Sequence, residues 1–436
     1  MQQWTRSRFA LLAAAFCLEV AVGCGGGGST TTTTPPPPVQ NGPPSGSEFL
    51  YAFGGTGTIS PGGGSIYVSS LNSAGQLTEP VDVTPQNLPV VMLEQLPAVA
   101  FGKNIYVPGY DQEYFTDAVF PFSITGTKGQ LAAQSNYPVN FGGASNLQDF
   151  LVDGLGRYLY ANFYLGIDQY AIQAFPINQS SGEIINGTNY YVEPNFTGTL
   201  ILQAADPAGK YLYAVALTPG GIEIFVYSIA ASTGMVSEVT GSPFPMSIQG
   251  DNLNLFISPS GKFLYFYGQA TDQGDLLRPA LYVYSVDAAT GTPTPIPASP
   301  IILPNANGSP KLSPTGNLLY MPERFVDDAG NPSFDIGVFK VNQVDGTISA
   351  SAVSSFSTLC STFYPDPSGK ILLIGPSGSN AQTFWSFLVD DSTGALTPAK
   401  GSPFFANDGY TQNWFYTIVK FHNCCKSLPS GRGAPR

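Results

Sequence analysis

Two loop-like stretches of the sequence, residues 268–279 and 322–334, combine arginine with several carboxylates. Arginine can hold a carboxylate by paired hydrogen bonds, and a nearby glutamate can accept a proton from water. We therefore take Arg278, Arg324 and Glu323 as candidate catalytic residues for chemistry on a sugar acid or a lactone. The candidate ligand-binding carboxylates beside them are Asp272, Asp275 and Asp327. The alternative is that all these groups are solvated loop charges that pair weakly with one another.

Aromatic residues in other predicted loops have the right chemistry to stack on sugar rings. The candidates are Tyr110, Tyr114, Tyr410 and Trp414. The alternative is that they are ordinary surface residues, because the chain has 23 tyrosines and an exposed tyrosine needs no functional explanation.

Several other kinds of chemistry are disfavoured by composition. His422 is the single histidine, which leaves few routes to general-base, serine-triad or metal chemistry at neutral pH. Residues 327–331 faintly resemble a calcium loop but lack the spacing and the closing glutamate of an EF-hand. We therefore expect no metal and no cofactor. The net charge of -12 disfavours nucleic acid, anionic membranes and polyphosphates as partners.

Repeated turn sequences show how these residues must be positioned. The pattern Asp/Ser-Pro-x-Gly, which suits a type I turn, precedes a hydrophobic-aromatic strand at residues 206–209, 258–261, 313–316 and 366–369. A second turn ends in glycine seven times, at Gly75, Gly129, Gly182, Gly234, Gly291, Gly346 and Gly394. The spacings of 48 to 57 residues leave room for four strands, a to d, in each unit. This pattern predicts an all-β chain that forms a seven-bladed β-propeller with four-stranded blades.

The two ends of the repeat predict how the ring closes. The first unit begins at Glu48 with strand b, whereas residues 413–421 follow the last unit and have no strand b after them. We expect this C-terminal strand to complete the N-terminal blade as its strand a, which removes the open sheet edges. The a–b and c–d turns then share one face of the ring, the turn face. The b–c and d–a loops share the other, the loop face, which carries the candidate residues.

The N-terminal region predicts export. In residues 1–23, Arg6 and Arg8 precede an apolar stretch too short to span a bilayer, which is typical of a signal peptide. Residues 21–24 (AVGC) resemble a lipobox, which predicts a lipid on Cys24, although an ordinary signal peptidase site is the alternative. The expected order is then a flexible Gly/Thr/Pro-rich tether (24–47), the propeller (48–423) and a C-terminal tail (424–436). We expect a cell-envelope protein that meets the membrane only through this anchor.

Three cysteines remain besides Cys24, namely Cys360, Cys424 and Cys425. An oxidising compartment permits a disulfide, but three thiols leave one unpaired, so the sequence leaves their state open.

Some blade segments carry a family resemblance. Residues 258–265 (SPSGKFLY), 282–291 (YVYSVDAATG) and 401–404 (GSPF) resemble the lactonase family of seven-bladed propellers, which includes bacterial 6-phosphogluconolactonase and fungal muconate-lactonizing enzymes. The resemblance covers residues 48 to about 421 and lies in turns and strands, so it speaks for the fold more than for the chemistry. It implies that members acting on lactones use histidine, arginine and acidic residues around the mouth of the central channel.

Two functions remain open at this point. The first is a lipid-anchored scaffold that binds a small polar ligand, a glycan or an envelope protein on its loop face. The alternative is a lactone hydrolase in which arginine holds the acid and Glu323 or an aspartate activates water. An enzyme should gather these groups at the channel mouth with shifted pKa values, whereas a scaffold should present a broad aromatic and acidic rim.

Overall fold

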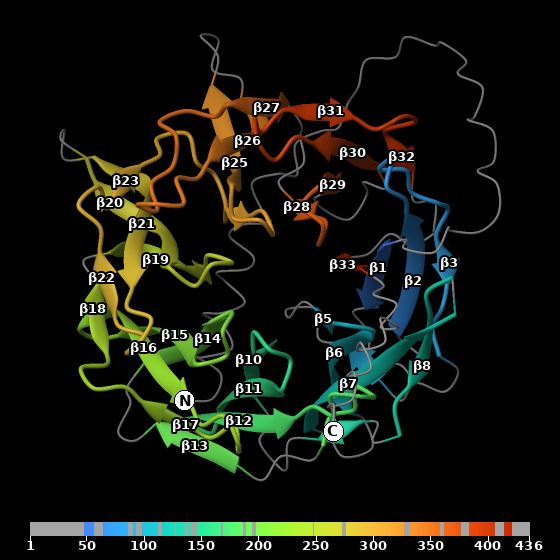
Figure 1. Cartoon of the computed structure of the whole chain (residues 1–436), viewed down its shortest axis with the longest axis horizontal. Helices are drawn as coiled ribbons and strands as arrows, with labels where there is room; N and C mark the ends of the chain where they lie inside the picture. Colours follow the sequence, from blue (N-terminus) through green and yellow to red (C-terminus); the bar gives the residue numbers. More distant parts are fainter. Residues whose placement is uncertain are drawn as a thin grey trace, which may run out of the picture.

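Seven antiparallel sheets stand around a central axis in the computed structural model, which Figure 1 views down that axis. The structure describes residues 48–55, 64–85, 90–92, 98–111, 116–126, 128–135, 138–140, 146–166, 169–185, 189–193, 198–246, 248–272, 276–326, 332–357, 362–375, 383–405 and 414–420. These residues form strands and turns and no helix, so no helix among them is long and apolar enough to cross a bilayer. The predicted all-β, seven-bladed propeller is confirmed.

The first three blades, from the axis outward, have these strands. Blade 1 consists of β33 (Trp414–Lys420), β1 (Glu48–Gly55), β2 (Gly64–Leu71) and β3 (Val81–Asp82). Blade 2 consists of β4 (Val90–Met92) and β5 (Val99–Phe101), then β6 (Asn104–Asp111), β7 (Thr116–Thr125), and β8 (Gln130–Ala133) with β9 (Val139–Asn140). Blade 3 consists of β10 (Leu147–Val152), β11 (Tyr158–Tyr164), β12 (Tyr170–Pro176) and β13 (Asn189–Glu193).

The other four blades follow the same plan, and in three of them the outermost strand is split in two. Blade 4 consists of β14 (Thr199–Ala205), β15 (Tyr211–Thr218), β16 (Gly221–Ile229), and β17 (Val236–Glu238) with β18 (Phe244–Met246). Blade 5 consists of β19 (Gln249–Ile257), β20 (Phe263–Thr271), β21 (Leu277–Val286), and β22 (Pro293–Pro295) with β23 (Ile301–Ile302). Blade 6 consists of β24 (Lys311–Leu312), β25 (Leu318–Val326), β26 (Pro332–Lys340) and β27 (Ser354–Ser357). Blade 7 consists of β28 (Thr362–Pro365), β29 (Ile371–Gly375), β30 (Thr383–Val389), and β31 (Leu396–Pro398) with β32 (Phe404–Phe405).

The ring closes as the sequence predicts. The C-terminal strand β33 pairs antiparallel with β1, and the register runs from Glu48 opposite Lys420 to Gly54 opposite Trp414. Strand a of blade 1 therefore comes from one end of the chain and strands b to d from the other. This pairing leaves no open seam between the first and last blades.

Local hydrogen bonds explain why the repeated turns form where they do. In the a–b turn of blade 4, Asp206 accepts from the Gly209 amide at its carbonyl oxygen (2.8 Å) and from the Lys210 amide at its carboxylate (3.1 Å). In the c–d turn of blade 5, the Asp287 carboxylate accepts from the amides of Ala289 and Thr290 at 2.9 and 2.8 Å. Short polar side chains that cap their own turn in this way fix its position along the chain.

The Ser-Pro pairs of the outer strands bridge the two parts of a split strand d. The Ser242 hydroxyl accepts from the Val226 amide (3.1 Å), the Ser299 hydroxyl from Val283 (3.0 Å) and the Ser402 hydroxyl from Ser386 (2.9 Å). Each bond satisfies a strand c amide at the place where strand d is interrupted, so the sheet keeps its pairing across the break.

Adjacent blades are joined by a recurring bond from a strand b tyrosine to a glycine of the next blade's c–d turn. The pairs of hydroxyl donor and carbonyl acceptor are Tyr51–Gly129 (2.8 Å), Tyr106–Gly182 (2.9 Å), Tyr160–Gly234 (2.9 Å) and Tyr213–Gly291 (3.4 Å). The acceptor must be glycine for two reasons, shown by Gly234: its φ is 71°, and a Cβ there would come within 2.5 Å of the Tyr158 ring.

The bond is missing in the last blades. Tyr265 and Tyr320 hold the same position in blades 5 and 6, yet their buried hydroxyls have no hydrogen-bond partner among the described residues. At the interface of blades 6 and 7 the Ser354 hydroxyl donates to the Gly394 carbonyl instead. Blade 7 has Leu373 at this position.

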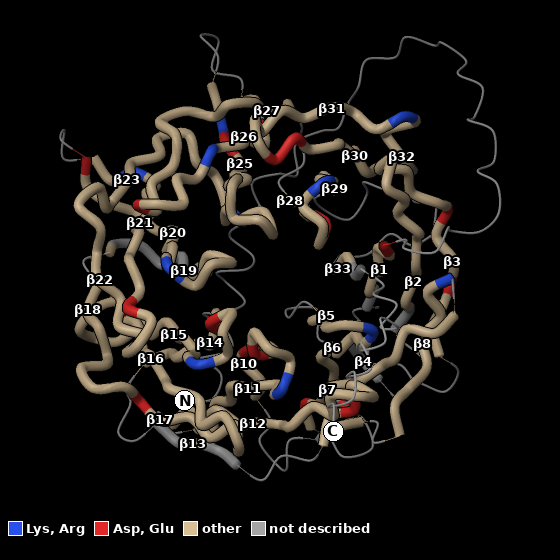
Figure 2. Tube along the Cα trace, viewed as in Figure 1, with Lys and Arg blue, Asp and Glu red and all other residues tan. Residues whose placement is uncertain are grey.

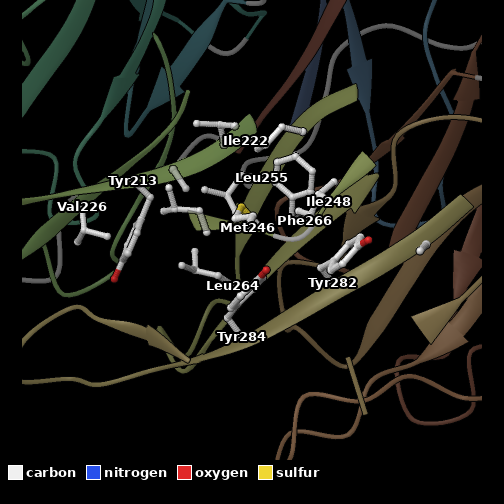
Figure 3. Close-up of a cluster of buried hydrophobic side chains, with 14 of the residues drawn as sticks. Tyr213, Ile222, Val226, Met246, Ile248, Leu255, Leu264, Phe266, Tyr282 and Tyr284 are labelled. Atoms are coloured by element: carbon white, nitrogen blue, oxygen red, sulfur yellow. The ribbon is translucent and has the colours of Figure 1, made fainter. Parts of the chain in front are cut away.

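Apolar side chains fill the space between blades. Figure 3 shows the largest interface cluster, in which Tyr213, Ile222 and Val226 of blade 4 pack against Leu264 and Phe266 of blade 5. Both faces of each sheet are thus buried against neighbours, which explains why strands b and c are apolar at nearly every position. This packing holds the innermost strands in a fixed ring.

Replacing Tyr160 by phenylalanine should lower the free energy of unfolding by about 1 kcal/mol, because the Gly234 carbonyl loses a buried donor. The matched control is Tyr320→Phe, whose hydroxyl is equally buried and has no described partner. We expect that change to be neutral or slightly stabilising. Urea unfolding of both variants measures the difference, and equal losses would show that the bond to glycine has no special role.

Candidate functional site

The innermost strands lie side by side around the axis and present one unpaired edge to it. Contacts join β33 to β5, β5 to β10, β10 to β14, β14 to β19 and β28 to β33. The pairing register of β10, β14 and β19 shifts along the strand, and such bulges redirect side chains. Polar residues at or after these shifts therefore need not follow the apolar pattern of the other strands.

Asp149 follows the shift in β10, in blade 3. Its carboxylate accepts from the Phe150 amide at 2.7 Å, and its side chain is partly buried. Burial raises the pKa of Asp149 to about 7, and the bond from the Phe150 amide offsets only part of that shift. A carboxyl group with this pKa can accept and release a proton at neutral pH, which is what a general base must do.

Lys311 lies on β24, in blade 6, and reaches toward β28 of blade 7. Its Nζ donates to the Phe363 carbonyl at 3.1 Å and lies 5.3 Å and 5.0 Å from the ring centroids of Phe363 and Tyr364. Burial lowers the pKa of Lys311 to about 8. The side chain nevertheless keeps an exposed surface.

Tyr364 stands beside this amine on β28. Burial raises the pKa of Tyr364 to about 12, and a hydrogen bond with Thr362 offsets part of the shift. The hydroxyl therefore stays neutral at any physiological pH. Figure 1 places β28 and β10 on opposite sides of the axis, so Lys311 and Tyr364 lie across the ring from Asp149. Charged residues are otherwise spread thinly around the ring (Figure 2).

The structure describes four of the loop-face candidates. Two of them form an ion pair across the b–c hairpin of blade 5, where Arg278 Nε lies 3.3 Å from Asp272 Oδ2. Glu323, on β25, is only 8% exposed and lies opposite Asp335 of β26. Its carboxylate occupies the space above Gly337, where a Cβ would come within 2.2 Å of it. Burial first, and the charge of Asp335 second, raise the pKa of Glu323.

Arg324 is the next residue along β25 and is exposed. Successive side chains of a strand point to opposite faces of the sheet, so Glu323 and Arg324 point apart. The Arg324 amide donates to the Asn305 carbonyl at 2.7 Å, which fixes the backbone there. Glu323 and Arg324 can act on one molecule only if it lies across the end of this strand.

The remaining candidates stay predictions. Tyr110 and Trp414 lie on β6 and β33, opposite Asp117 and Gly54, but their side chains are not described. The following residues lie outside the described part of the chain: Asp275, Asp327, Tyr114, Tyr410, Cys24, His422 and the other three mature cysteines. Within the described part, no group of three or more histidine, cysteine, aspartate and glutamate side chains is placed to hold a metal ion.

Sequence reasoning missed Asp149, Lys311 and Tyr364 on the innermost strands, although a signal was present. Lys311 and Tyr364 both stand two positions before the first residue of an a–b turn, Ser313 or Asp366. Asp149 stands four positions before the equivalent Asp153. Aligning the repeats on these turns would have shown charged or phenolic groups in strands a that are otherwise largely apolar or neutral.

Comparison with known proteins gives a result at the level of the fold. The sequence matches no family model and no curated protein. Among solved structures, it is similar to a candidate 6-phosphogluconolactonase from Bacteroides fragilis, with 20% identity, a TM-score of 0.59, and coverage of 86% of this chain and 98% of that one. A candidate 6-phosphogluconolactonase from Bacteroides uniformis gives 19% identity, a TM-score of 0.57, and coverage of 85% and 99%.

A third similar structure is the periplasmic gluconolactonase of Pseudomonas aeruginosa, with 16% identity and a TM-score of 0.54 over 86% of this chain and 99% of that one. All three matches span nearly the whole propeller and nearly the whole of the other protein. The chain therefore has the seven-bladed fold of lactonase-like propellers, as its turns and strands predict.

Proposed function

We propose that this protein hydrolyses a lactone, with Asp149 as the general base. The observation that supports the proposal most directly is a carboxyl group with a pKa of about 7 on an innermost strand. The fold adds support, because similar structures include proteins described as a gluconolactonase and as candidate 6-phosphogluconolactonases. The lactone hydrolase is therefore favoured over a scaffold that only binds a ligand.

The chemistry required of Asp149 is simple. Its carboxylate takes a proton from water while the water oxygen bonds to the lactone carbonyl carbon. The tetrahedral intermediate then collapses, the ring C–O bond breaks, and the leaving oxygen receives the proton that Asp149 holds. One water is consumed and a hydroxy acid is formed, with Asp149 restored.

The predicted loop-face site remains a second place for the same reaction. Its support is Glu323, a nearly buried carboxyl group whose pKa is raised by burial and by Asp335. In that arrangement Arg324 or Arg278 holds the acid group and Glu323 activates water. The two sites lie on different elements, so single substitutions distinguish them.

We also propose that the protein is exported and anchored through Cys24. Strand β1 begins at the turn face, since Glu48 lies opposite Leu71, which precedes the Gly75 turn. A tether ending at Glu48 would therefore join the propeller at its turn face.

The decisive test is hydrolysis of a panel of sugar-acid lactones, with spontaneous opening subtracted. We expect Asp149→Asn to reduce kcat by at least about 100-fold, whereas Glu79→Gln, at an exposed position on the outside of blade 1, should change nothing. The wild-type rate should rise with pH through about 7, as Asp149 loses its proton. Loss of turnover in Arg324→Ala but not in Asp149→Asn would move the site to the loop face. No turnover by the wild type would reject the enzyme.

Asp149→Asn should increase the stability of the folded protein, although it reduces activity. A folded-state pKa raised to about 7 from the usual 3.8 means that the folded protein binds more protons, so stability is lost as pH rises toward 7. Asp149→Asn removes this loss. Its free energy of unfolding should exceed that of the wild type by roughly 1 to 3 kcal/mol at about pH 8, and by less at about pH 5. A variant that is less stable at both pH values would show that Asp149 is a structural residue.

Anchoring can be tested separately. Cys24→Ala should move the protein from the membrane fraction to the soluble fraction of the cell envelope, because no lipid can be attached. Mass spectrometry of the mature N-terminus should show a lipidated cysteine in the wild type. A mature N-terminus that lacks a lipid would support the ordinary signal peptidase site.

A further inference from the structure

Asn162 is a fully buried polar residue directly across from Asp149. It lies on β11 at the register position opposite Asp149 of β10, and its exposed fraction is 0%. Residues that face each other in an antiparallel pair project to the same side of the sheet, with Cβ atoms about 4.5 to 5.5 Å apart. The two polar side chains are therefore neighbours on one face of blade 3.

The surroundings of this pair are apolar. Ile172, which faces Asn162 from β12, belongs to a buried cluster with Leu200 of β14 in blade 4. Leu151, two positions after Asp149, packs against the same cluster. Aliphatic side chains offer no hydrogen bond, so Asp149 is the polar group among the register neighbours of Asn162.

One end of the Asn162 amide is satisfied and the other is not. Its Nδ2 donates to the Ala171 carbonyl on β12 at 3.3 Å. Its Oδ1 is sealed from solvent and has no hydrogen-bond partner among the described residues. A buried amide oxygen without a donor costs free energy and calls for an explanation. A carboxyl group opposite it becomes a donor once it is protonated.

We propose that Asn162 is a positioning residue for Asp149, and that its Oδ1 accepts a hydrogen bond from the carboxyl proton that Asp149 takes from water. This inference rests on the proposed hydrolysis for the source of that proton, but the bond itself requires only a protonated Asp149. When water bonds to the lactone carbonyl carbon, its proton moves to Asp149 and is held toward Asn162. The proton then passes to the ring oxygen as the ring C–O bond breaks, and Asn162 gains and loses no atom.

Such a bond changes the balance between the two forms of Asp149. A hydrogen bond to the protonated form of an acid disfavours its charged form. Asn162 then adds to the effect of burial, which raises the pKa of Asp149 to about 7. Among the strands that contact β10, β5 and β14 carry no ionisable side chain, and the ionisable groups of β11 are the phenols Tyr158, Tyr160 and Tyr164. Burial raises the pKa of Tyr160, so this phenol adds no charge beside Asn162.

Titration of Asp149 tests the assignment without requiring any turnover. ¹³C NMR of full-length protein labelled at the aspartate carboxyl carbons gives the titration, and the resonance missing from Asp149→Asn identifies the residue. Asn162→Leu removes the acceptor and should lower the midpoint by about one pH unit, which corresponds to one hydrogen bond. Asn162→Ala, which cannot overfill the interface, should lower it similarly. A midpoint that is unchanged or raised in both variants overturns the inference.

The control variant is Ser386→Ala. Ser386 lies on β30 in blade 7, and its Oγ is likewise buried without a hydrogen-bond partner among the described residues. This change should leave both the titration of Asp149 and the hydrolysis of lactones unaffected. A shift of the same size in Ser386→Ala would show a general effect of removing a buried oxygen and count against a bond between Asn162 and Asp149.

Kinetics separate this inference from the proposed reaction. Asn162→Leu should reduce kcat at about pH 8 by roughly threefold to tenfold and leave KM unchanged, because a carboxylate with a lower pKa is a weaker base. The loss should be smaller at about pH 6, where more of the variant's Asp149 is ionised. Turnover by Asn162→Leu equal to that of the wild type at both pH values would overturn the inference and leave the hydrolysis standing. A wild type that hydrolyses no lactone, while Asn162→Leu shifts the titration, would reject the hydrolysis and leave the bond standing.

Discussion

The bond from a strand b tyrosine to the glycine of the next blade's turn sets the spacing of blades 1 to 5. A tyrosine is long enough to reach the neighbouring blade, and a glycine is the residue whose backbone can approach an aromatic ring so closely at positive φ. Four successive interfaces use this bond, from Tyr51 to Gly291. Because all blades share one closed ring, any change in this spacing moves the innermost strands. The position of Asp149, in blade 3, depends on it.

A closed ring creates an unusual environment on its axis. The innermost strands are surrounded by seven blades, yet one edge of each has no strand beside it in the part of the chain that the structure describes. Side chains there can lie close to protein on several sides and still reach solvent, as the partly buried Asp149 and the exposed Lys311 do. Burial of this kind disfavours the charged form of any side chain, which raises the pKa of a carboxyl group and lowers that of an amine. Both shifts are found, toward about 7 at Asp149 and about 8 at Lys311.

The sequence predicted the ring better than its site because the two depend on interactions of different range. A turn such as 206–209 is fixed by hydrogen bonds within five residues, so its chemistry is readable locally and its repetition gives seven blades. The closing strand followed from counting strands at the two ends. Nothing local distinguishes Lys311 from any exposed lysine, because the rings beside it belong to another blade. The arginines of the loop face are easier to pick out in the sequence than Lys311, because Arg278 has its partner Asp272 only six residues away.

The scarcity of histidine need not prevent acid–base chemistry at neutral pH. Histidine is useful because its ordinary pKa lies near 7, but a desolvated aspartate reaches the same range and has the further property of being neutral when protonated. Asp149 therefore can supply what the single histidine of the chain would otherwise have to supply. The raised pKa lowers the stability of the folded protein as pH rises toward 7. Such losses are common at functional sites. A carboxyl group of this kind on an innermost strand is compatible with the proposed hydrolysis.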